Sequence, residues 1–292
     1  MELDDSQGAA ALRGGRAYAN LSEWHKILVH GSDSRSWLND LLTADIGALS
    51  TGSSRPALLL SPTGRIRATV TIASISQGLL LIQEPIQPSS IHALLAPYVL
   101  SSDVELADVT ESMTLYAFPG SEPPHIPGAE SVRPSCLGPG ADLIGPRTQQ
   151  SLRQVVDGPV LAGPEALEAW RIHRGIPRFP IDLTTESLPH EADLDAAIDY
   201  GKGCYLGQEA VAKVRNLGHP PWVVLSMRSD GAVAPNDPLI ADGEEVGRVT
   251  SAAGVEGHTA VIARVRWSAR DRALETASGT PLQTSGLASA AA

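Results

Sequence analysis

The chain has 292 residues, 42% of them hydrophobic, which allows a sizeable core in one large or two ordinary domains and excludes disorder throughout. Because 22 Lys and Arg stand against 33 Asp and Glu, the formal net charge is −11, and the chain as a whole has no electrostatic reason to bind nucleic acid or an anionic membrane surface. With two cysteines, Cys136 and Cys204, the chain holds neither a disulfide scaffold nor a four-cysteine zinc or iron–sulfur site of its own, and the pair fits a reducing cytoplasm.

Both ends of the sequence are expected to be loose tails. The acidic start lacks the bases and the apolar stretch of a targeting signal, and there is no run of 18 apolar residues, so we expect no membrane association. Residues 1–17 are predicted to be disordered. Residues 284–292, which are small and uncharged, are predicted to form a second tail.

The first part of the chain, residues 18–218, shows strand and helix patterns in alternation. A helix is predicted from Asp33, an N-cap residue, to about Thr43. A turn at 61–64 joins two strands, and the second strand alternates apolar and polar residues from Arg65 to Ile72. The other predicted elements are strands at 26–30, 78–83, 104–109 and 113–118, and helices at 88–99 and 165–174.

Two further segments differ from this alternation. Residues 119–147 are dense in Pro and Gly and are predicted to be a surface loop, in which Cys136 is an incidental thiol. After residue 218 only short strand patterns remain, at 222–228, 244–253 and 259–268. Residues 219–283 are therefore predicted to form a small antiparallel barrel or sandwich.

Residues 201–209 read Gly-Lys-Gly-Cys-Tyr-Leu-Gly-Gln-Glu and carry the most informative pattern. Gly207 is predicted to be the N-cap of a helix over 208–214, which places Cys204 just ahead of a helix N-terminus and two residues from Lys202. Both neighbours favour a thiolate, so one hypothesis is a thiol of lowered pKa. The alternative is a small buried hydrophobe, and the local pattern leaves both open.

Charge changes sign at this motif. Asp182 to Asp199 contains six acids and no base, which indicates a solvated face. The segment from Lys202 to Arg228 contains four bases and one acid. It fits either a small polyanion, such as a carboxylate tail, or ordinary scattered surface charge.

Lys202-Gly-Cys-Tyr-Leu-Gly-Gln-Glu209 resembles the signature of the YgfZ family, folate-binding proteins that support iron–sulfur cluster assembly and repair and are related to the glycine cleavage T-protein. The resemblance runs from about residue 20 to 270 in the family's order. The other similar segments are His25 to Asp45, Leu60 to Arg65, Trp170 to Pro177, Leu188 to Glu191 and Glu245 to Ser251. The resemblance implies an α+β, GcvT-like fold: a folate-binding N-terminal portion around a central channel, then a C-terminal β-barrel.

The resemblance also implies a site. Cys204 and Lys202 are the expected catalytic residues, and the expected cofactor is tetrahydrofolate or a folate derivative. The residues expected to bind it are Asp45, Arg171, His173, Glu191, Tyr205, Gly207, Gln208 and Glu209. His173 stands where relatives often place a glutamate that binds the pterin, and a neutral imidazole offers one acceptor instead of two oxygens.

The implied function is support of iron–sulfur cluster assembly or repair in client enzymes such as radical-SAM enzymes. One cysteine cannot hold a cubane cluster alone, so either a partner protein or a second copy of this chain must supply other ligands. T-proteins carry a catalytic aspartate where Gly64 to Val70 has no carboxylate, so aminomethyl transfer is not expected. Two alternatives stay open: a folate-dependent one-carbon transferase or demethylase whose base is Asp45 or Glu191, and an interaction module with a vestigial pocket.

Overall fold

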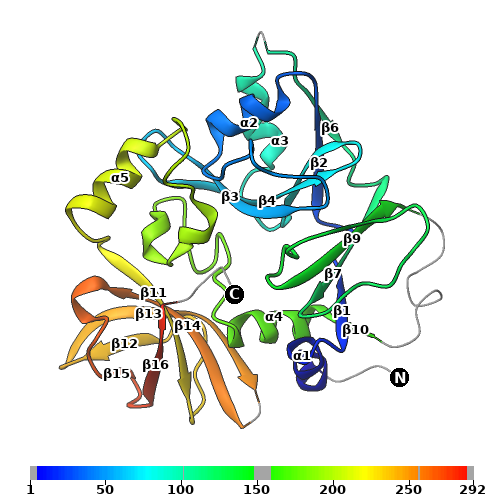
Figure 1. Ribbon diagram of the computed structural model, residues 1–292. Helices are drawn as coiled ribbons and strands as arrows, with labels where there is room; N and C mark the ends of the chain where they lie inside the picture. The colour runs from blue at the N-terminus through cyan, green and yellow to red at the C-terminus, as the bar shows by residue number, and fades with distance from the viewer. Residues whose placement is uncertain (1–4, 101, 148–158, 256, 288–292) are drawn as a thin grey trace.

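Two five-stranded sheets and a closed six-stranded barrel make up the computed structural model (Figure 1). The structure describes residues 5–100, 102–147, 159–255 and 257–287. Within these ranges, no helix combines the length and the apolar character needed to cross a membrane.

The first sheet contains the predicted hairpin, and its strand order is β3-β4-β5-β2-β6. Its strands are β2 (His25–His30), β3 (Ser54–Leu60), β4 (Ile66–Ile75), β5 (Gly78–Gln83) and β6 (Glu105–Asp108). The alternation predicted for the second hairpin strand is confirmed, because Ile66, Ala68, Val70 and Ile72 are all buried. Helices α2 (Ser34–Leu41) and α3 (Ile91–Leu95) share a hydrophobic cluster with this sheet. The helix predicted at 88–99 is shorter, and the 3-10 helix η1 (Ala96–Tyr98) continues it.

The second sheet has the order β10-β1-β7-β9-β8. Its strands are β1 (Ala17–Asn20), β7 (Met113–Pro119), β8 (Glu130–Val132), β9 (Gly140–Pro146) and β10 (Val160–Ala162). The surface loop predicted at 119–147 is therefore wrong for β8 and β9. The apolar run of β9 is interrupted by the buried Asp142 and bordered by glycines, so the sequence pattern does not indicate a strand.

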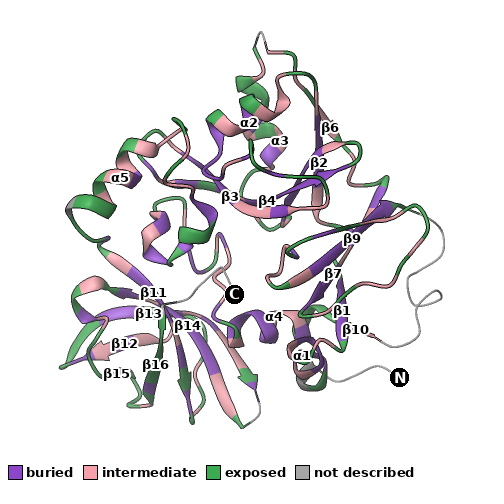
Figure 2. Ribbon diagram, in the orientation of Figure 1, coloured by how far each residue is buried: buried purple, intermediate pink, exposed green. Residues whose placement is uncertain are grey.

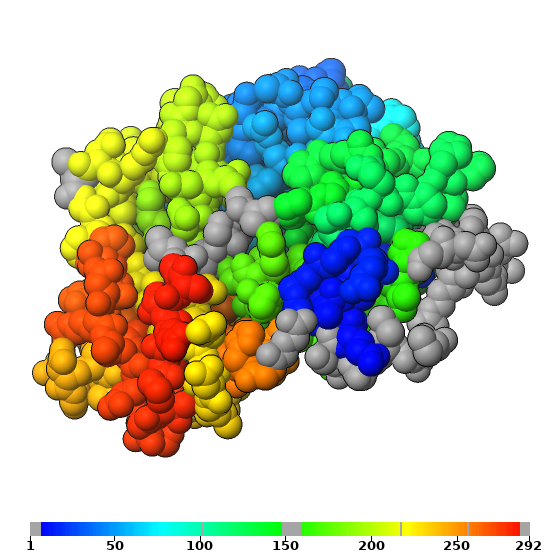
Figure 3. Space-filling view, turned by 60° about the horizontal axis from the view of Figure 1, so that its bottom comes forward, coloured from blue at the N-terminus to red at the C-terminus, as the bar shows by residue number. Residues whose placement is uncertain are grey.

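The disordered tail predicted for residues 1–17 is wrong for the described residues, because α1 (Asp5–Arg13) forms there. This helix packs on α4 (Pro164–His173) through small side chains. A Cβ added to Gly8 would lie 2.7 Å from Cβ of Ala166. Close contact between small residues, and not a wide apolar face, holds α1. Figure 3 shows α1 (blue) on the same face of the molecule as the last strand of the barrel (red).

The C-terminal strands close into a barrel of order β11-β14-β13-β12-β15-β16, as expected. They are β11 (Trp222–Ser229), β12 (Pro238–Ala241), β13 (Glu244–Val255), β14 (His258–Arg266), β15 (Leu274–Thr276) and β16 (Pro281–Leu287), with the 3-10 helix η5 (Trp267–Ala269) between β14 and β15. Strand β16 pairs with β11, so part of the tail predicted at 284–292 belongs to the barrel. Residues 288–292 lie outside the described residues.

The segment between α4 and the barrel carries the motif. It contains η3 (Pro189–Glu191), η4 (Leu194–Ala197) and α5 (Gln208–Leu217), which begins where the sequence predicts, with Gly207 as its N-cap. Half of the residues of α4 are buried, whereas α5 is largely exposed or half-buried (Figure 2).

Candidate functional site

Lys202 anchors the cysteine motif to the end of α2. Its Nζ donates to the backbone carbonyls of Asn39, Leu42 and Ala44, the latter two at 2.8 Å. Burial lowers the pKa of Lys202 to about 8, which leaves an ammonium at pH 7 with all three protons donated. These bonds complete the end of a helix, where a cation is favoured. They direct the ammonium to α2, so the structure supports an anchoring role and gives no contact by which Lys202 would activate Cys204.

Cys204 lies exposed on this anchored loop. Its neighbour Tyr205 is buried in one hydrophobic cluster, and Leu206 packs against the cluster under α2 and α3. The two residues that follow Cys204 are thus held by two different hydrophobic clusters, while Cys204 itself is exposed. The interpretation of Cys204 as a small buried hydrophobe is wrong.

Two glycines bring the turn of the hairpin against the start of α5. Gly207 has φ +85°, and a Cβ there would lie 2.6 Å from the carbonyl oxygen of Ser61. Gly64, in that turn, has φ +77°, and its Cβ would lie 2.8 Å from Cβ of Ala210. Left-handed backbone and close approach both require glycine at these positions.

Replacing Gly207 by alanine is expected to lower the free energy of unfolding by at least about 1–2 kcal/mol, the cost of left-handed backbone for a residue with a Cβ. The contact with Ser61 adds to this cost. The matched control is Gly203→Ala in the same loop, where a Cβ would meet nothing within 4 Å. Urea unfolding of both variants measures the difference, and equal losses would show that Gly207 has no special conformational role.

A pocket of about 150 Å³ lies at the centre of the N-terminal portion. Trp24, Trp170 and Phe179 form its aromatic walls. Its polar lining includes Thr69 and Thr71 of β4, Glu84 and Gln87 in the segment after β5, and Arg178. A wider cleft of about 600 Å³ is adjacent to the pocket, because Trp24, Glu84, Leu167 and Arg178 line both spaces.

Cys136 belongs to the wall of this pocket. Its backbone N–H donates to the buried carboxylate of Asp142 at 2.8 Å. Burial, reinforced by the Asp142 charge, raises the pKa of the Cys136 thiol well above its usual range. Cys136 is therefore a protonated wall residue at neutral pH, and a nucleophilic role does not suit it.

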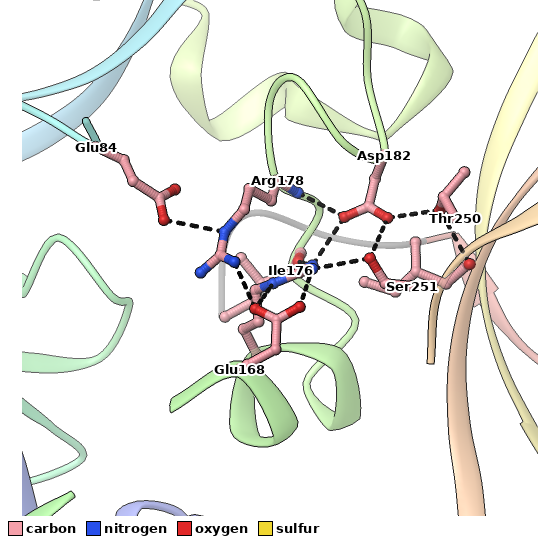
Figure 4. Close-up of polar contacts among 9 residues, drawn as sticks. Glu84, Glu168, Ile176, Arg178, Asp182, Thr250 and Ser251 are labelled. Atoms are coloured by element: carbon pink, nitrogen blue, oxygen red, sulfur yellow. Dashed lines mark hydrogen bonds and ion pairs between the residues drawn. The ribbon is translucent and has the colours of Figure 1, made fainter. Parts of the chain in front are cut away.

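A chain of ion pairs runs from the pocket to the barrel (Figure 4). Arg178 pairs with Glu84 at 3.0 Å and with Glu168 at 2.5 Å, and Arg171 pairs with Glu168 and Asp182. The five N–H donors of Arg171 are all accepted: by both oxygens of Glu168, the carbonyl of Ile176, Asp182 and the hydroxyl of Ser251 on β13. Arg171 thus joins α4 to the barrel.

Most of the residues that the resemblance assigns to the cofactor lie outside the described lining of the pocket and the cleft. Arg171 lines the pocket, but its donors are committed to the ion-pair chain. His173 lies at the end of α4, with its ring centre 6.0 Å from that of His258 on the barrel. Within the described lining of the pocket and the cleft, none of the other assigned residues occurs: Asp45, Glu191, Tyr205, Gly207, Gln208 and Glu209.

The structure also changes the interpretation of the acidic segment 182–199 and the basic segment 202–228. Asp182 and Glu191 are completely buried, so a solvated face is the wrong description for these two acids. Glu191 pairs with Arg264 of the barrel at 3.1 Å. Of the basic segment, Lys213 and Arg215 are exposed on α5, and none of its four bases is part of the described lining of the pocket or the cleft.

The sequence patterns missed Glu84, Glu168 and Arg178. Glu84 directly follows the apolar strand β5, and a charged residue at the end of a buried strand is a usable signal. Arg178 follows Pro177 in an irregular segment, and no local pattern identifies it.

Comparison with known proteins agrees with this architecture. Residues 5–126 match the model of the GCVT N-terminal domain. The aminomethyltransferase T of the glycine cleavage system from Bartonella henselae superposes with a TM-score of 0.78 at 15% identity, covering 95% of this chain and 87% of that protein. The chain therefore has the α+β, GcvT-like fold with a C-terminal barrel.

Three relatives refine the assignment. A putative chloroplastic transferase of Arabidopsis thaliana is 25% identical over 86% of this chain, and the match spans 65% of that relative. A tRNA-modifying protein YgfZ from Photobacterium profundum is 24% identical over 69% of this chain and 67% of its own length. An iron–sulfur cluster assembly factor IBA57 homolog from Cryptococcus neoformans is 26% identical over 72% of this chain and 65% of its own length. The chain is thus similar to GcvT-related proteins, among them YgfZ and IBA57 proteins.

Proposed function

We propose that this protein is a tetrahydrofolate-binding factor that supports the assembly or repair of iron–sulfur clusters in client enzymes, with Cys204 as the residue that acts on the client. The observation that carries the proposal is an exposed thiol on a loop anchored by Lys202, outside the described lining of the central pocket. The name of the IBA57 relative, an iron–sulfur cluster assembly factor, supports a role of this kind.

The pocket supports the folate part of the proposal. A cavity of about 150 Å³ accepts a small flat ring, and walls of Trp24, Trp170 and Phe179 suit an aromatic heterocycle. The adjoining cleft of about 600 Å³ offers room for the rest of a folate. The pterin would occupy the pocket and the remainder of the molecule the cleft.

The loop supports the cluster part. A thiolate is the usual ligand of iron–sulfur clusters, and a client reaches an exposed cysteine without rearrangement of this protein. Since one cysteine cannot hold a cluster alone, the remaining ligands come from the client. The expected clients are iron–sulfur enzymes, including radical-SAM enzymes.

A folate-dependent transferase is the second candidate, because the pocket does contain one carboxylate suited to a base, Glu84. The bases expected from the sequence, Asp45 and Glu191, are not part of its described lining. Formation of methylenetetrahydrofolate from an aminomethylated or N-methylated donor would favour the transferase over the factor.

Titration with 5-formyltetrahydrofolate tests the pocket. We expect saturable binding that quenches tryptophan fluorescence, because Trp24 and Trp170 line the pocket. Cys204→Ala is expected to bind with the same affinity, since the thiol is not in the described pocket lining. Absence of saturable binding to the wild-type protein would remove folate from the proposal.

A further inference from the structure

A second groove lies beside the barrel, apart from the central pocket. It has a volume of about 510 Å³, within the range of small-molecule sites, and residues of the segment 181–184 and of strands β11, β13 and β14 line it. Leu183 lines the central pocket, whereas Asp182 and Thr184 line this groove, so the chain itself divides the two spaces. We call it the barrel groove. The lining residues that carry the argument are Ile181, Trp222, Arg248, Arg264 and Arg266.

Strand pairing places three arginines on one face of the barrel wall. Arg264 on β14 is the direct partner of Arg248 on β13, and Arg266 is the direct partner of Trp222 on β11. Direct partners, and residues two apart on a strand, share a face of a sheet. That face is the outer one, because Val265, between the two arginines of β14, belongs to the hydrophobic cluster inside the barrel. Like charges directly opposite each other destabilise a sheet, and a bound anion would offset this cost.

Trp222 fixes two of these arginines in place. The guanidinium carbons of Arg264 and Arg266 lie 4.9 and 5.4 Å from the centre of its ring, within the range of cation–π attraction. Arg264 also donates through Nε and Nη2 to a single oxygen of the buried Glu191, at 3.3 and 3.1 Å. Its Nη1 has no acceptor among the described residues. The two guanidinium groups are thus held in position, with N–H donors left for a ligand.

The charge of the barrel groove favours an anion. The charged residues of its described lining are Asp182, Glu245, Arg248, Arg264 and Arg266. Their charges leave 3 − 2 = +1, in a chain whose net charge is −11. The partners outside this lining do not alter the balance, because Arg171 beside Asp182 and Glu191 beside Arg264 cancel each other. The excess charge is that of Arg266, which is exposed and has no carboxylate partner in the described part of the chain.

We propose that the barrel groove binds a small phosphate ester, with the phosphate on Arg264 and Arg266 and the organic part against Ile181. A phosphate has three terminal oxygens and accepts from several guanidinium groups in different planes, whereas a carboxylate has two oxygens in one plane. Arg248 supplies a third guanidinium if the ligand replaces its exposed partner Glu245. Ile181 is a large apolar side chain that is 37% exposed, which suits contact with the organic part.

This site is independent of the proposed function. None of the residues in its described lining also lines the central pocket or the adjacent cleft. Substitutions in the barrel groove are therefore expected to leave the binding of 5-formyltetrahydrofolate unchanged.

Calorimetric titration of the full chain with phenyl phosphate tests the site, with inorganic phosphate and benzoate as comparison ligands. We expect phenyl phosphate to bind more tightly than either, because it alone combines phosphate oxygens with an apolar ring. Arg266→Gln is expected to bind phenyl phosphate about 10-fold more weakly, since a charge-assisted hydrogen bond is lost. The matched control is Arg228→Gln, which removes the same charge from an exposed position at the other end of β11 and is expected to bind like wild type.

Ile181→Ala separates the organic part from the phosphate. This variant is expected to bind inorganic phosphate like wild type and to lose the preference for phenyl phosphate. Thermal unfolding confirms that each variant is folded. The inference would be overturned by a wild-type protein that does not bind phenyl phosphate, or by equal affinities in Arg266→Gln and Arg228→Gln. Binding of a single-stranded oligonucleotide without binding of phenyl phosphate would also overturn it, because the groove would then recognise a nucleic acid and not a small ester.

Discussion

Replacing Asp182 by alanine is expected to lower the free energy of unfolding by about 3–5 kcal/mol, because it leaves the buried guanidinium of Arg171 short of its partner. Asp182 is completely buried and accepts from Arg171 Nη1 and the backbone N–H of Arg178, both at 2.8 Å. It also accepts from the hydroxyls of Thr250 and Ser251 on β13. One substitution thus removes four hydrogen bonds, two of which join the N-terminal portion to the barrel.

Urea unfolding, followed by circular dichroism, measures this effect. Asp230→Ala is the matched control, because Asp230 is exposed and has no ion-pair or hydrogen-bond partner among the described residues. Its free energy of unfolding should stay within about 0.5 kcal/mol of wild type. Overlapping unfolding curves for the two variants would mean that the ion-pair chain does not hold the barrel in place.

Cys204→Ala is expected to abolish support of client enzymes while leaving the free energy of unfolding within about 0.5 kcal/mol of wild type, because the side chain is exposed. Client activity in cells that lack the wild-type chain, measured beside unfolding of the purified variant, separates the two effects. Destabilisation large enough to account for the loss of client activity would contradict a direct role of the thiol.

Cys136→Ala is the control, for which we expect a loss of stability without a loss of client support. Its thiol is half-buried in the pocket wall, so the variant is expected to lose some stability and to keep its support of clients at temperatures where it stays folded. The two cysteines would then show opposite effects on stability and on client activity. Equal effects of the two substitutions on clients would remove the distinction between them.

The sequence predicts those parts of the fold that depend on local pattern. Four predicted features are all present: the alternation in β4, the helix predicted at 165–174, the start of α5 at Gln208 and the change to strands after residue 218. The missed elements depend on contacts distant in sequence. Helix α1 is held by small residues against α4, and β8 and β9 pair across a Pro- and Gly-rich segment.

In the candidate site, too, the sequence predicts what depends on local pattern and misses what depends on contacts between distant residues. The motif around Cys204 is contiguous, so the sequence identifies it, and it also predicts that Gly207 begins the helix. The pocket is built from residues far apart in the chain. Glu84 and Arg178 form an ion pair because the end of β5 lies beside the segment after α4. No local sequence pattern predicts a contact between two such distant segments. The resemblance likewise placed His173 at the cofactor, whereas its ring lies beside that of His258.

The most direct test of the proposed function is the iron and acid-labile sulfide content of an iron–sulfur client purified from cells in which this chain is wild type, Cys204→Ala or absent. The proposal predicts full cluster content with the wild-type chain, and an equally low content with Cys204→Ala and without the chain. Full cluster content in the client from Cys204→Ala cells would contradict the role proposed for the exposed thiol.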